Sequence, residues 1–532
     1  MDFLVHHMLR ASTARFPEKE AVVYGNERVS YESMWQHTGS LADGLRRAGA
    51  ARSDRIGIYL EPSVELSTSI FGVSRAGGVF VPIHHSLFPN QVEHIARDCQ
   101  MKGLITDAAR FARLESVIRN CPSLEFVVVV GKDEVDSDDN SITTYDYYQM
   151  RDATSPTEIA DVAIDKDLAA ILYTSGSTGQ PKGVMLSHAN VVAGATIVSD
   201  YLGITDADRI LAVLPFSFDA GLNQLTTSIQ QGATCVVMKF LFAKEIVAML
   251  GKERITGLAG VPSLWNLIVQ KSSKLEQNPP EHLRYITNTG GAMPLNILAD
   301  LRRLLPTTDV VLMYGLTEAF RSTYLPPAEL DRRPTSIGKA IPCTEILVVN
   351  DEGRACAPGE VGELVHRGPT VSLGYWGHPD LTDRVLRPHP FLPPGATDAE
   401  KVCFSGDLVK MDEDGFLFFV GRRDNMIKSS GFRISPNEVE EALCKAGQLR
   451  EAAVIGLPDQ ALGQRLKAFV VPPDGVPVDE EALLNGTAAL LPRHMVPKSV
   501  EVLTELPKTP SGKIDYPELR KRETQPTETS AP

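Results

Sequence analysis

The chain has 532 residues, 43% of them hydrophobic, and carries 67 acidic residues against 53 basic ones, a net charge of −14. Its length is too great for one compact core and predicts two or more domains. The acidic balance excludes broad nucleic-acid binding, so an anionic ligand has to be held by local positive charge. Because no run of 18 apolar residues occurs, no membrane span is expected.

Strand-like and helix-like segments alternate through about the first three hundred residues. The strand-like runs include RIGIYLE, GGVFVPI, LEFVVVVG, RILAVLPF and DVVLMYG, whereas SYESMWQHTGSLADGLRRAG shows helical spacing. This alternation predicts an α/β fold with mostly parallel sheets in a large N-terminal domain. After Ser336 the pattern changes to short extended pieces with Gly, Pro and Asp turns, which indicates a small antiparallel or barrel-like subdomain.

Beyond the charged turn GRRDN the chain has the pattern of a second, smaller α/β domain. Ser435, with Glu438 three residues later, has the spacing of a capping box at a helix start. We therefore expect an N-terminal domain over 1–423, with the barrel-like subdomain at 336–423, and a C-terminal domain over 424–520. The tail, 521–532, has few apolar residues and is expected to be disordered.

Seven widely spaced cysteines form no C-x-x-C pair. This argues against a zinc site or a disulfide framework and favours a reducing compartment. The first residues, MDFLVHHMLRASTARF, lack the apolar core and cleavage site of a secretory signal. We expect a cytoplasmic location.

The most informative motif is ILYTSGSTGQPKGVMLSH, residues 171–188. An apolar strand, Ala169–Tyr173, leads into six small residues and then a lysine: Thr174, Ser175, Gly176, Ser177, Thr178, Gly179 and Lys182. Glycines allow sharp turns that present N–H groups, hydroxyls add donors, and the lysine adds charge, which together suit a polyphosphate. The motif differs from the P-loop, because Gly183 rather than Ser or Thr follows the lysine.

Four further segments carry residues suited to nucleotide chemistry. NTGGAMPLNIL and MYGLTEAF each follow a strand, and ligands in α/β proteins lie where strands end. A carboxylate such as Glu318 there could hold Mg²⁺, the alternative being an ordinary helix start. In SGDLVKMDEDGFLFFVGRRDN, Asp407 and Arg422 could hold ribose or form a structural ion pair, and LPKTPSGKIDYPELR places Lys513 after a turn.

In order and spacing these segments resemble the AMP-forming acyl-CoA synthetases, a superfamily that includes peptide-synthetase adenylation domains and beetle luciferases. The resemblance covers all but the tail. QVEHIARDCQMKGLITD, FDAGLNQLTT and GRRDNMIKSSGFRISPNEVEEAL are most similar to acyl-CoA ligases associated with exosortase loci. The resemblance to the superfamily implies that ATP activates a carboxylic acid, giving an acyl-adenylate and pyrophosphate. The acyl group is then transferred to a thiol, and AMP is released.

The resemblance also implies roles for single residues. The loop from Thr174 to Lys182 would close over the β- and γ-phosphates. Gly290, Gly291, Ala292, Tyr314 and Gly315 would line the adenine and the acyl pocket. Thr317 would contact the α-phosphate, Glu318 would bind Mg²⁺, Asp407 and Arg422 would hold ribose, and Arg433 would approach phosphate. Asp424 fits the hinge of a mobile C-terminal domain, Lys513 would bridge the attacking carboxylate and the α-phosphate, and Ser430 and Gly431 would line the thiol channel.

The sequence does not determine which acid is activated or which thiol accepts the acyl group. Phe218 and Asp219 belong to the expected pocket wall, where Asp219 would either hold a substrate ammonium group or cap a helix. His84 and His85 stand where the superfamily usually has a different sequence motif. The acceptor is CoA or, alternatively, the phosphopantetheine of an acyl- or peptidyl-carrier protein, onto which a stand-alone adenylating enzyme would load an amino or hydroxy acid. A catalytically silent nucleotide-binding protein is a third reading, which the joint presence of Lys182, Glu318, Asp407 and Lys513 opposes.

Overall fold

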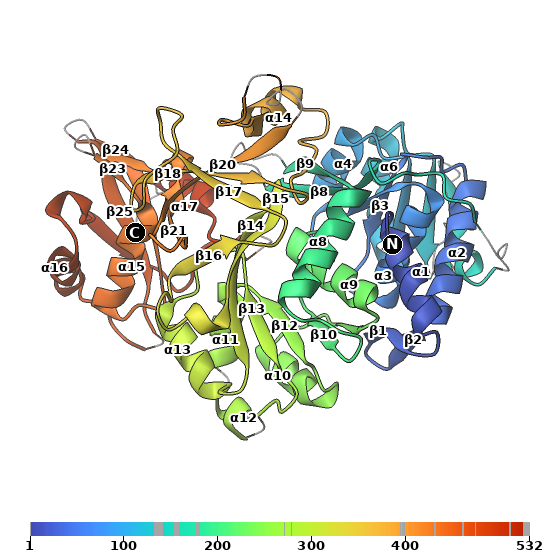
Figure 1. Cartoon of the computed structure of the whole chain (residues 1–532), viewed down its shortest axis with the longest axis horizontal. Coiled ribbons are helices and arrows are strands. Elements are labelled where there is room, and N and C mark those ends of the chain that lie inside the picture. The colour runs from blue at the N-terminus through green and yellow to red at the C-terminus, as the bar shows by residue number, and fades with distance from the viewer. Residues whose placement is uncertain are drawn as a thin grey trace, which may run out of the picture. The chain divides into compact units, whose positions relative to one another are not determined.

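A computed structural model describes residues 2–131, 142–153, 159–175, 181–270, 272–277, 279–393, 395, 400–429, 432–459, 462–473, 475–509 and 512–524. The chain divides into two compact units (Figure 1). The first comprises Met1–Gly176, Gln180–Ile346 and His366–Cys403, and the second comprises Ser177–Gly179, Leu347–Val365 and Phe404–Pro532.

The first unit contains a seven-stranded sheet in which β7, β6, β5, β3, β4 and β8 run parallel and β9 pairs antiparallel with β8. Parallel neighbours need crossover helices, which is why helical and extended patterns alternate in the sequence. In spatial order the strands are β7 (Thr143–Asp146), β6 (Phe126–Val130), β5 (Gly103–Asp107), β3 (Arg55–Tyr59), β4 (Val79–Pro82), β8 (Leu168–Ser175) and β9 (Pro181–Ser187).

A second sheet of the same unit is parallel from β1 to β14 and antiparallel at both sides. Its buried strands are almost wholly apolar, as strands covered on both faces must be. In spatial order the strands of this sheet are β2 (Glu27–Ser30), β1 (Glu20–Tyr24), β11 (Thr234–Val237), β10 (Arg209–Ala212), β12 (Gly257–Gly260), β13 (Tyr285–Asn288), β14 (Asp309–Leu316), β15 (Ala319–Leu325) and β16 (Ser336–Ala340).

Five helices lie between these two sheets, and one continuous apolar core joins them to both (Figure 1). They are α1 (Val5–Arg15), α2 (Tyr31–Arg47), α3 (Val64–Ala76), α8 (His188–Tyr201) and α9 (Asp219–Gln231). A separate core packs α4 (Pro89–Asp98) and α6 (Glu115–Asn120) against the other face of the seven-stranded sheet. The remaining elements of this unit are α5 (Ala108–Phe111), α7 (Tyr147–Arg151), α10 (Ala243–Lys252), α11 (Pro262–Val269), α12 (Ser272–Gln277), α13 (Leu295–Leu304), α14 (Pro379–Val385) and β19 (Leu386–Pro388).

The strands between residues 345 and 422 are separated by turns, and one of them, of 11 residues, is longer than the short pieces that the sequence predicts. β17 (Glu345–Val349), β18 (Val361–Arg367), β20 (Lys401–Met411) and β21 (Leu417–Arg422) follow one another in spatial order. β20 and β21 form an antiparallel pair in which Asp407 lies opposite Arg422.

The rest of the second unit is a small α/β fold built on a mixed sheet. β22 (Ile427–Ser429), β23 (Phe432–Ile434), β24 (Glu451–Asp459) and β25 (Gly463–Val471) pair antiparallel, and β26 (Ser499–Val502) joins β25 in parallel. α15 (Pro436–Gly447) and α16 (Glu480–Leu490) share a core with one face, and α17 (Tyr516–Thr524) shares a core with the other. Ser435 caps α15 by accepting from the N–H of Glu438, as its spacing predicts.

The α/β class and the small C-terminal fold are thus confirmed. Among the helices of the described residues, none combines the length and the apolar character that a membrane crossing requires.

Candidate nucleotide and acyl site

The expected phosphate loop is the tip of the β8–β9 hairpin. Thr174 lies directly across from Lys182, and Ser175 from Pro181, so the strand register fixes where the loop leaves the sheet. Gly183 is required at the next position, because a Cβ there would lie 2.5 Å from Cγ2 of Ile171. The side chain of Ser175 and residues Gly176, Ser177, Thr178 and Gly179 lie outside the described part of the chain.

The first glycine turn follows β13 directly. Gly290 has φ +78°, a conformation that glycine adopts without steric cost. Asn288, 2% exposed, holds this turn by donating from Nδ2 to the carbonyl of Gly291 over 2.9 Å. Its Oδ1 has no hydrogen-bond partner among the described residues, so a buried acceptor is available beside the Gly290–Ala292 backbone.

The second turn follows β14, which ends at Leu316 and turns back through Thr317 and Glu318 into β15. The helix-start alternative for these two residues is therefore wrong, since the segment is a β-hairpin. Gly315 is required, because a Cβ there would lie 2.4 Å from the backbone nitrogen of Arg321. The neighbouring Tyr314 ring stacks on the fully buried imidazole of His366, with ring centroids 6.1 Å apart.

The carboxylate of Glu318 is positioned by a segment far away in the sequence. The hydroxyl of Tyr375 donates to Glu318 Oε1, and the N–H of Ser372 donates to the Glu318 carbonyl. The same segment, residues 371–376, exchanges backbone hydrogen bonds with Met185 of β9. We call residues 371–376 the bridging segment, because it connects the phosphate-loop hairpin to the turn that carries Glu318.

The expected wall of the acyl pocket is the start of α9. Phe218 is the N-cap residue, and Asp219 is the first helical residue, half-buried. Because the N-cap position is occupied by Phe218 and Asp219 lies inside the helix, the alternative that Asp219 is the cap of this helix is wrong. The ring of His84 lies 5.6 Å from that of Phe218, and burial lowers the His84 pKa to about 4. This histidine therefore stands neutral beside the wall.

In the second unit, Asp407 and Arg422 do form an ion pair, with 3.2 Å between Oδ1 and Nε. Asp407 is 5% exposed, whereas the side chain of Arg422 is about half exposed to solvent, so the pair holds the edge of a buried carboxylate in place. Such a pair can bind ribose hydroxyls or serve structure alone, and the geometry leaves both uses available.

The other predicted residues of the second unit are less fully described. Arg433 lies in β23 opposite Lys428, and Asp424 lies in the turn after β21, but their side chains lie outside the described residues. Ser430 and Gly431 lie outside them altogether. Lys513 is exposed on a tight turn in which the N–H of Thr509 donates to its carbonyl over 2.8 Å.

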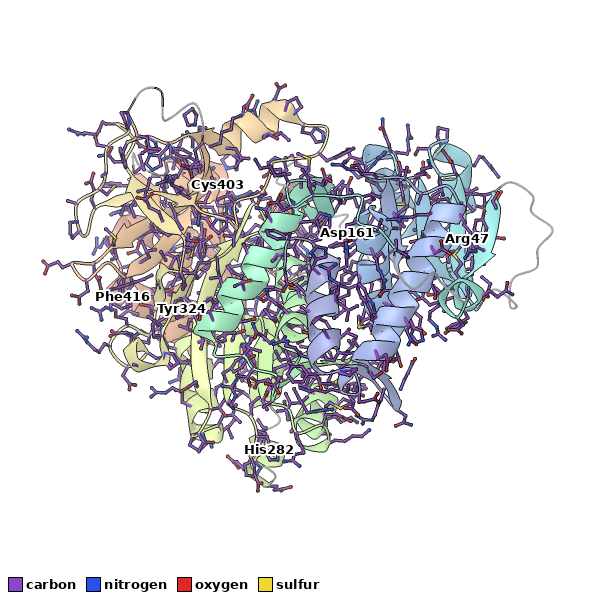
Figure 2. The ribbon with its side chains drawn as sticks, turned by 45° about the vertical axis from the view of Figure 1, so that its right-hand side comes forward. Arg47, Asp161, His282, Tyr324, Cys403 and Phe416 are labelled. Atoms are coloured by element: carbon purple, nitrogen blue, oxygen red, sulfur yellow. The ribbon has the colours of Figure 1, made fainter. Side chains whose placement is uncertain are left out.

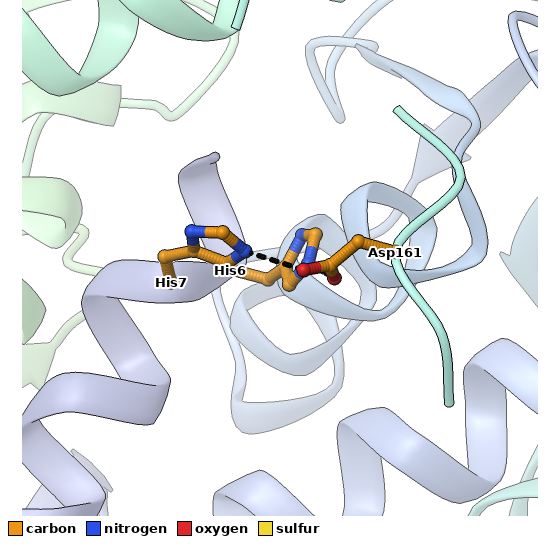
Figure 3. A group of neighbouring side chains, drawn as sticks. All are labelled: His6, His7 and Asp161. Atoms are coloured by element: carbon orange, nitrogen blue, oxygen red, sulfur yellow. Dashed lines mark hydrogen bonds and ion pairs between the residues drawn. The ribbon is translucent and has the colours of Figure 1, made fainter. Parts of the chain in front are cut away.

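A cluster that sequence reasoning missed joins α1 to residue 161. His6 and His7 place Nε2 2.7 and 2.8 Å from the two carboxylate oxygens of Asp161 (Figure 3; Asp161 is also labelled in Figure 2). These three groups could hold a metal ion by type, but each imidazole nitrogen facing the carboxylate is already hydrogen-bonded to it. The pKa of Asp161 is held well below its usual range, first by its hydrogen bond with His6. The cluster fastens the N-terminal helix to the first unit.

Comparison with known proteins identifies the family. Residues 9–376 match the model of the AMP-binding enzyme family, and residues 438–513 match the AMP-binding enzyme C-terminal domain. The chain belongs to the AMP-binding enzymes. The resemblance inferred from the motifs is thereby confirmed.

Individual relatives give the same family. The chain is 32% identical to tyrocidine synthase 3 of Brevibacillus parabrevis over 96% of its own length but only 7% of that much longer protein. It is 28% identical to the long-chain-fatty-acid–CoA ligase of Bacillus subtilis (strain 168), over 97% of this chain and 94% of the relative. Among solved structures, the anthranilate CoA ligase AuaEII in complex with anthranoyl-AMP superposes with a TM-score of 0.87 at 25% identity, covering 98% of this chain and 97% of that one.

Proposed function

We propose that this AMP-binding enzyme is an AMP-forming acid–CoA ligase. It activates a carboxylic acid with ATP to an acyl-adenylate and pyrophosphate, and then transfers the acyl group to the thiol of CoA with release of AMP. The observation that carries the proposal is the arrangement within the first unit, where the bridging segment hydrogen-bonds both to the hairpin carrying Lys182 and to the turn carrying Glu318.

The chemistry explains why these residue types are needed. A carboxylate that attacks the α-phosphorus of ATP brings negative charge to a group that is already negative. Catalysis therefore depends on positioning and on neutralising charge, which lysine ammonium groups and backbone N–H donors supply. We assign Lys182 and the loop from Thr174 to Gly179 to the β- and γ-phosphates, and Thr317 and Lys513 to the reacting α-phosphate.

The adenosine part of ATP is assigned by the same reasoning. Gly290, Gly291 and Ala292 offer backbone that a flat ring can approach, beside the ring of Tyr314 and the glycine at 315. Asp407 and Arg422 hold ribose through the carboxylate edge and the guanidinium, and Arg433 approaches phosphate. Asp424 is assigned as the hinge, and Ser430 and Gly431 as the lining of the thiol channel.

The residues around Glu318 fit a magnesium ion. Mg²⁺ prefers oxygen ligands and shares them with nucleotide phosphates. The half-buried carboxylate of Glu318 has one oxygen fixed by Tyr375, which leaves the other to a metal, and the Thr317 hydroxyl is adjacent in sequence. When bound, the ion would neutralise phosphate charge.

CoA is the proposed acceptor because the match to a stand-alone CoA ligase covers 94% of that relative. Loading of a carrier protein is the second candidate, and the observation that favours it is the higher identity, 32%, to tyrocidine synthase 3. A cytoplasmic location is proposed as well, since the cysteines are widely spaced in the sequence and Cys343 is exposed to solvent, which suits a reducing compartment.

The test is acid-dependent ATP–pyrophosphate exchange across fatty, aryl, hydroxy, amino and dicarboxylic acids. Exchange followed by AMP release on adding CoA supports the ligase. Exchange with AMP release only on adding a carrier protein supports the second candidate. If no acid drives exchange, although ATP with Mg²⁺ raises the melting temperature, the enzyme proposal fails and the nucleotide-binding reading stands.

A further inference from the structure

Arg321 is buried in the first unit, and none of the described residues gives its guanidinium a carboxylate partner. Only 3% of the surface of Arg321 is exposed to solvent. Nη2 donates to the carbonyl of Ala220 over 3.2 Å and Nη1 faces the sulfur of Met313, a weak acceptor, at 3.3 Å. Nε has no partner, and the guanidinium makes no ion pair, among the described residues. A cation left in this state is destabilised by several kcal/mol.

The backbone at Arg321 is held in an unusual conformation. Its φ is +58°, which costs a residue with a Cβ of order 1 kcal/mol. The pairing of β14 and β15 is irregular at this point, opposite Gly315, where only glycine leaves room. β15, which also carries Tyr324 (labelled in Figure 2), therefore places a buried cation directly behind the turn of Gly315, Thr317 and Glu318.

Arg321 lines a small cavity of about 20 Å³. This is room for about one or two water-sized groups. The polar side chains of α9 that share the lining are Asn223, Gln224 and Thr227. Gln224 is 4% exposed and donates from Nε2 to the Leu211 carbonyl, while its Oε1 has no partner among the described residues. The cavity thus offers a cation together with a buried acceptor.

The cavity lies along the strands that lead to the proposed reaction site. Thr287 of β13 and Met313 of β14 line it, and these strands are parallel neighbours. Gly290 follows Thr287 by three residues and Thr317 follows Met313 by four, which corresponds to ~10–13 Å of extended chain. An acid whose reacting carboxylate lies at these turns, and whose far end follows the two strands, therefore approaches Arg321.

We propose that Arg321 binds a second carboxylate at the far end of the substrate, so that the enzyme activates a short dicarboxylic acid. The guanidinium fork matches a carboxylate in two parallel hydrogen bonds, which gives the buried cation its missing partner. The free Gln224 Oε1 accepts a hydrogen bond from a hydroxyl or amino substituent beside that carboxylate. This inference names the acid and rests on the proposed function.

Other charged arginines of the first unit show what a carboxylate partner looks like. Arg333, 9% exposed, forms an ion pair with Glu329, and Arg284 makes three hydrogen bonds to the carboxylate of Asp208. Arg321 differs from both in having sulfur and carbonyl acceptors only among the described residues. Arg333→Gln is therefore a matched control, since it removes a buried guanidinium away from the cavity.

The experiment compares dicarboxylic acids of three to eight carbons, plain or bearing a hydroxyl or amino group, with monocarboxylic acids of equal length. Pyrophosphate exchange gives kcat/KM, and acid-dependent melting shifts with ATP and Mg²⁺ give binding. We expect wild type and Arg333→Gln to prefer one dicarboxylate. Arg321→Gln should raise its KM by ~10–100-fold, the loss expected for hydrogen bonds to a charged group, and leave monocarboxylates unchanged.

Three outcomes overturn the inference: a preference for monocarboxylates in wild type, an unchanged preference for dicarboxylates in folded Arg321→Gln, or no acid-dependent melting shift at all. The two proposals fail separately. Exchange with monocarboxylates alone overturns the inference and supports the ligase. A dicarboxylate shift that Arg321→Gln abolishes, without exchange for any acid, supports the binding site and overturns the ligase. Arg321→Lys is the second variant, in case Arg321→Gln does not fold. It keeps the charge but not the fork, so it should retain part of the preference for dicarboxylates.

Discussion

His188 should make the first unit sensitive to acid. Its imidazole is 1% exposed at the start of α8, and Nδ1 accepts a hydrogen bond from the N–H of Val5 over 3.2 Å. An acceptor nitrogen must be unprotonated, and burial lowers the pKa to about 3. The unfolded chain takes up a proton near pH 6.5, whereas the folded protein does not.

The sign and size follow from linkage. Because the folded pKa lies below the unfolded one, the unfolded state binds more protons below pH 6.5, and stability falls as pH falls. Between pH 7.5 and pH 5.0 this single group removes about 2 kcal/mol from the free energy of unfolding. This loss of free energy depends mainly on the pKa of the unfolded state, since the pKa of the folded state lies well below the pH range from 5.0 to 7.5.

The assay is urea unfolding at both pH values, monitored by circular dichroism, after the unfolding has been shown to be reversible. Other groups titrate in the same range, so the informative quantity is a difference between variants. His188→Gln should lose about 2 kcal/mol less than wild type between pH 7.5 and pH 5.0. His282→Gln, at an exposed position labelled in Figure 2, should match wild type. An identical pH dependence in all three proteins would refute the reasoning.

Two predictions concern catalysis. Lys513→Ala should lower adenylation by ~10²–10³-fold, since it removes charge from the reacting phosphate, but should leave thioester formation from a supplied acyl-adenylate largely intact. Equal loss in both half-reactions would contradict this role. Tyr375→Phe should raise the Mg²⁺ concentration needed for half-maximal exchange by about 10-fold, because Glu318 loses the donor that orients it. Tyr148→Phe, which removes a similar hydrogen bond to Glu65, is the control and should leave that concentration unchanged.

The fold could be predicted in outline because apolar periodicity is a local property. The alternation of strands and helices before Ser336 and the cap at Ser435 both depend on residues close in sequence, and both are found. Turn positions were also predictable, since Gly290 and Glu318 each follow a buried strand and Gly315 lies at the end of one.

The remaining features depend on contacts between distant residues. Tyr375 lies 57 residues from the carboxylate that it orients, and nothing in GYWGHP marks it. Arg321 carried no signal either, because an arginine in a strand usually faces solvent, and its burial follows from an irregular strand pairing. The capping alternative for Asp219 failed for a similar reason, since the helix begins one residue earlier than a capping aspartate requires.

The bridging segment also bears on solubility. β9 is the last strand in the order of the seven-stranded sheet, and the bridging segment hydrogen-bonds to its residues Gly183 and Met185. An uncovered apolar edge is a template for aggregation. Substitutions that detach residues 371–376 should thus lower both the yield of protein and its catalysis. Activity measured in cells would confuse these two effects, and only activity per mole of purified, folded enzyme separates them.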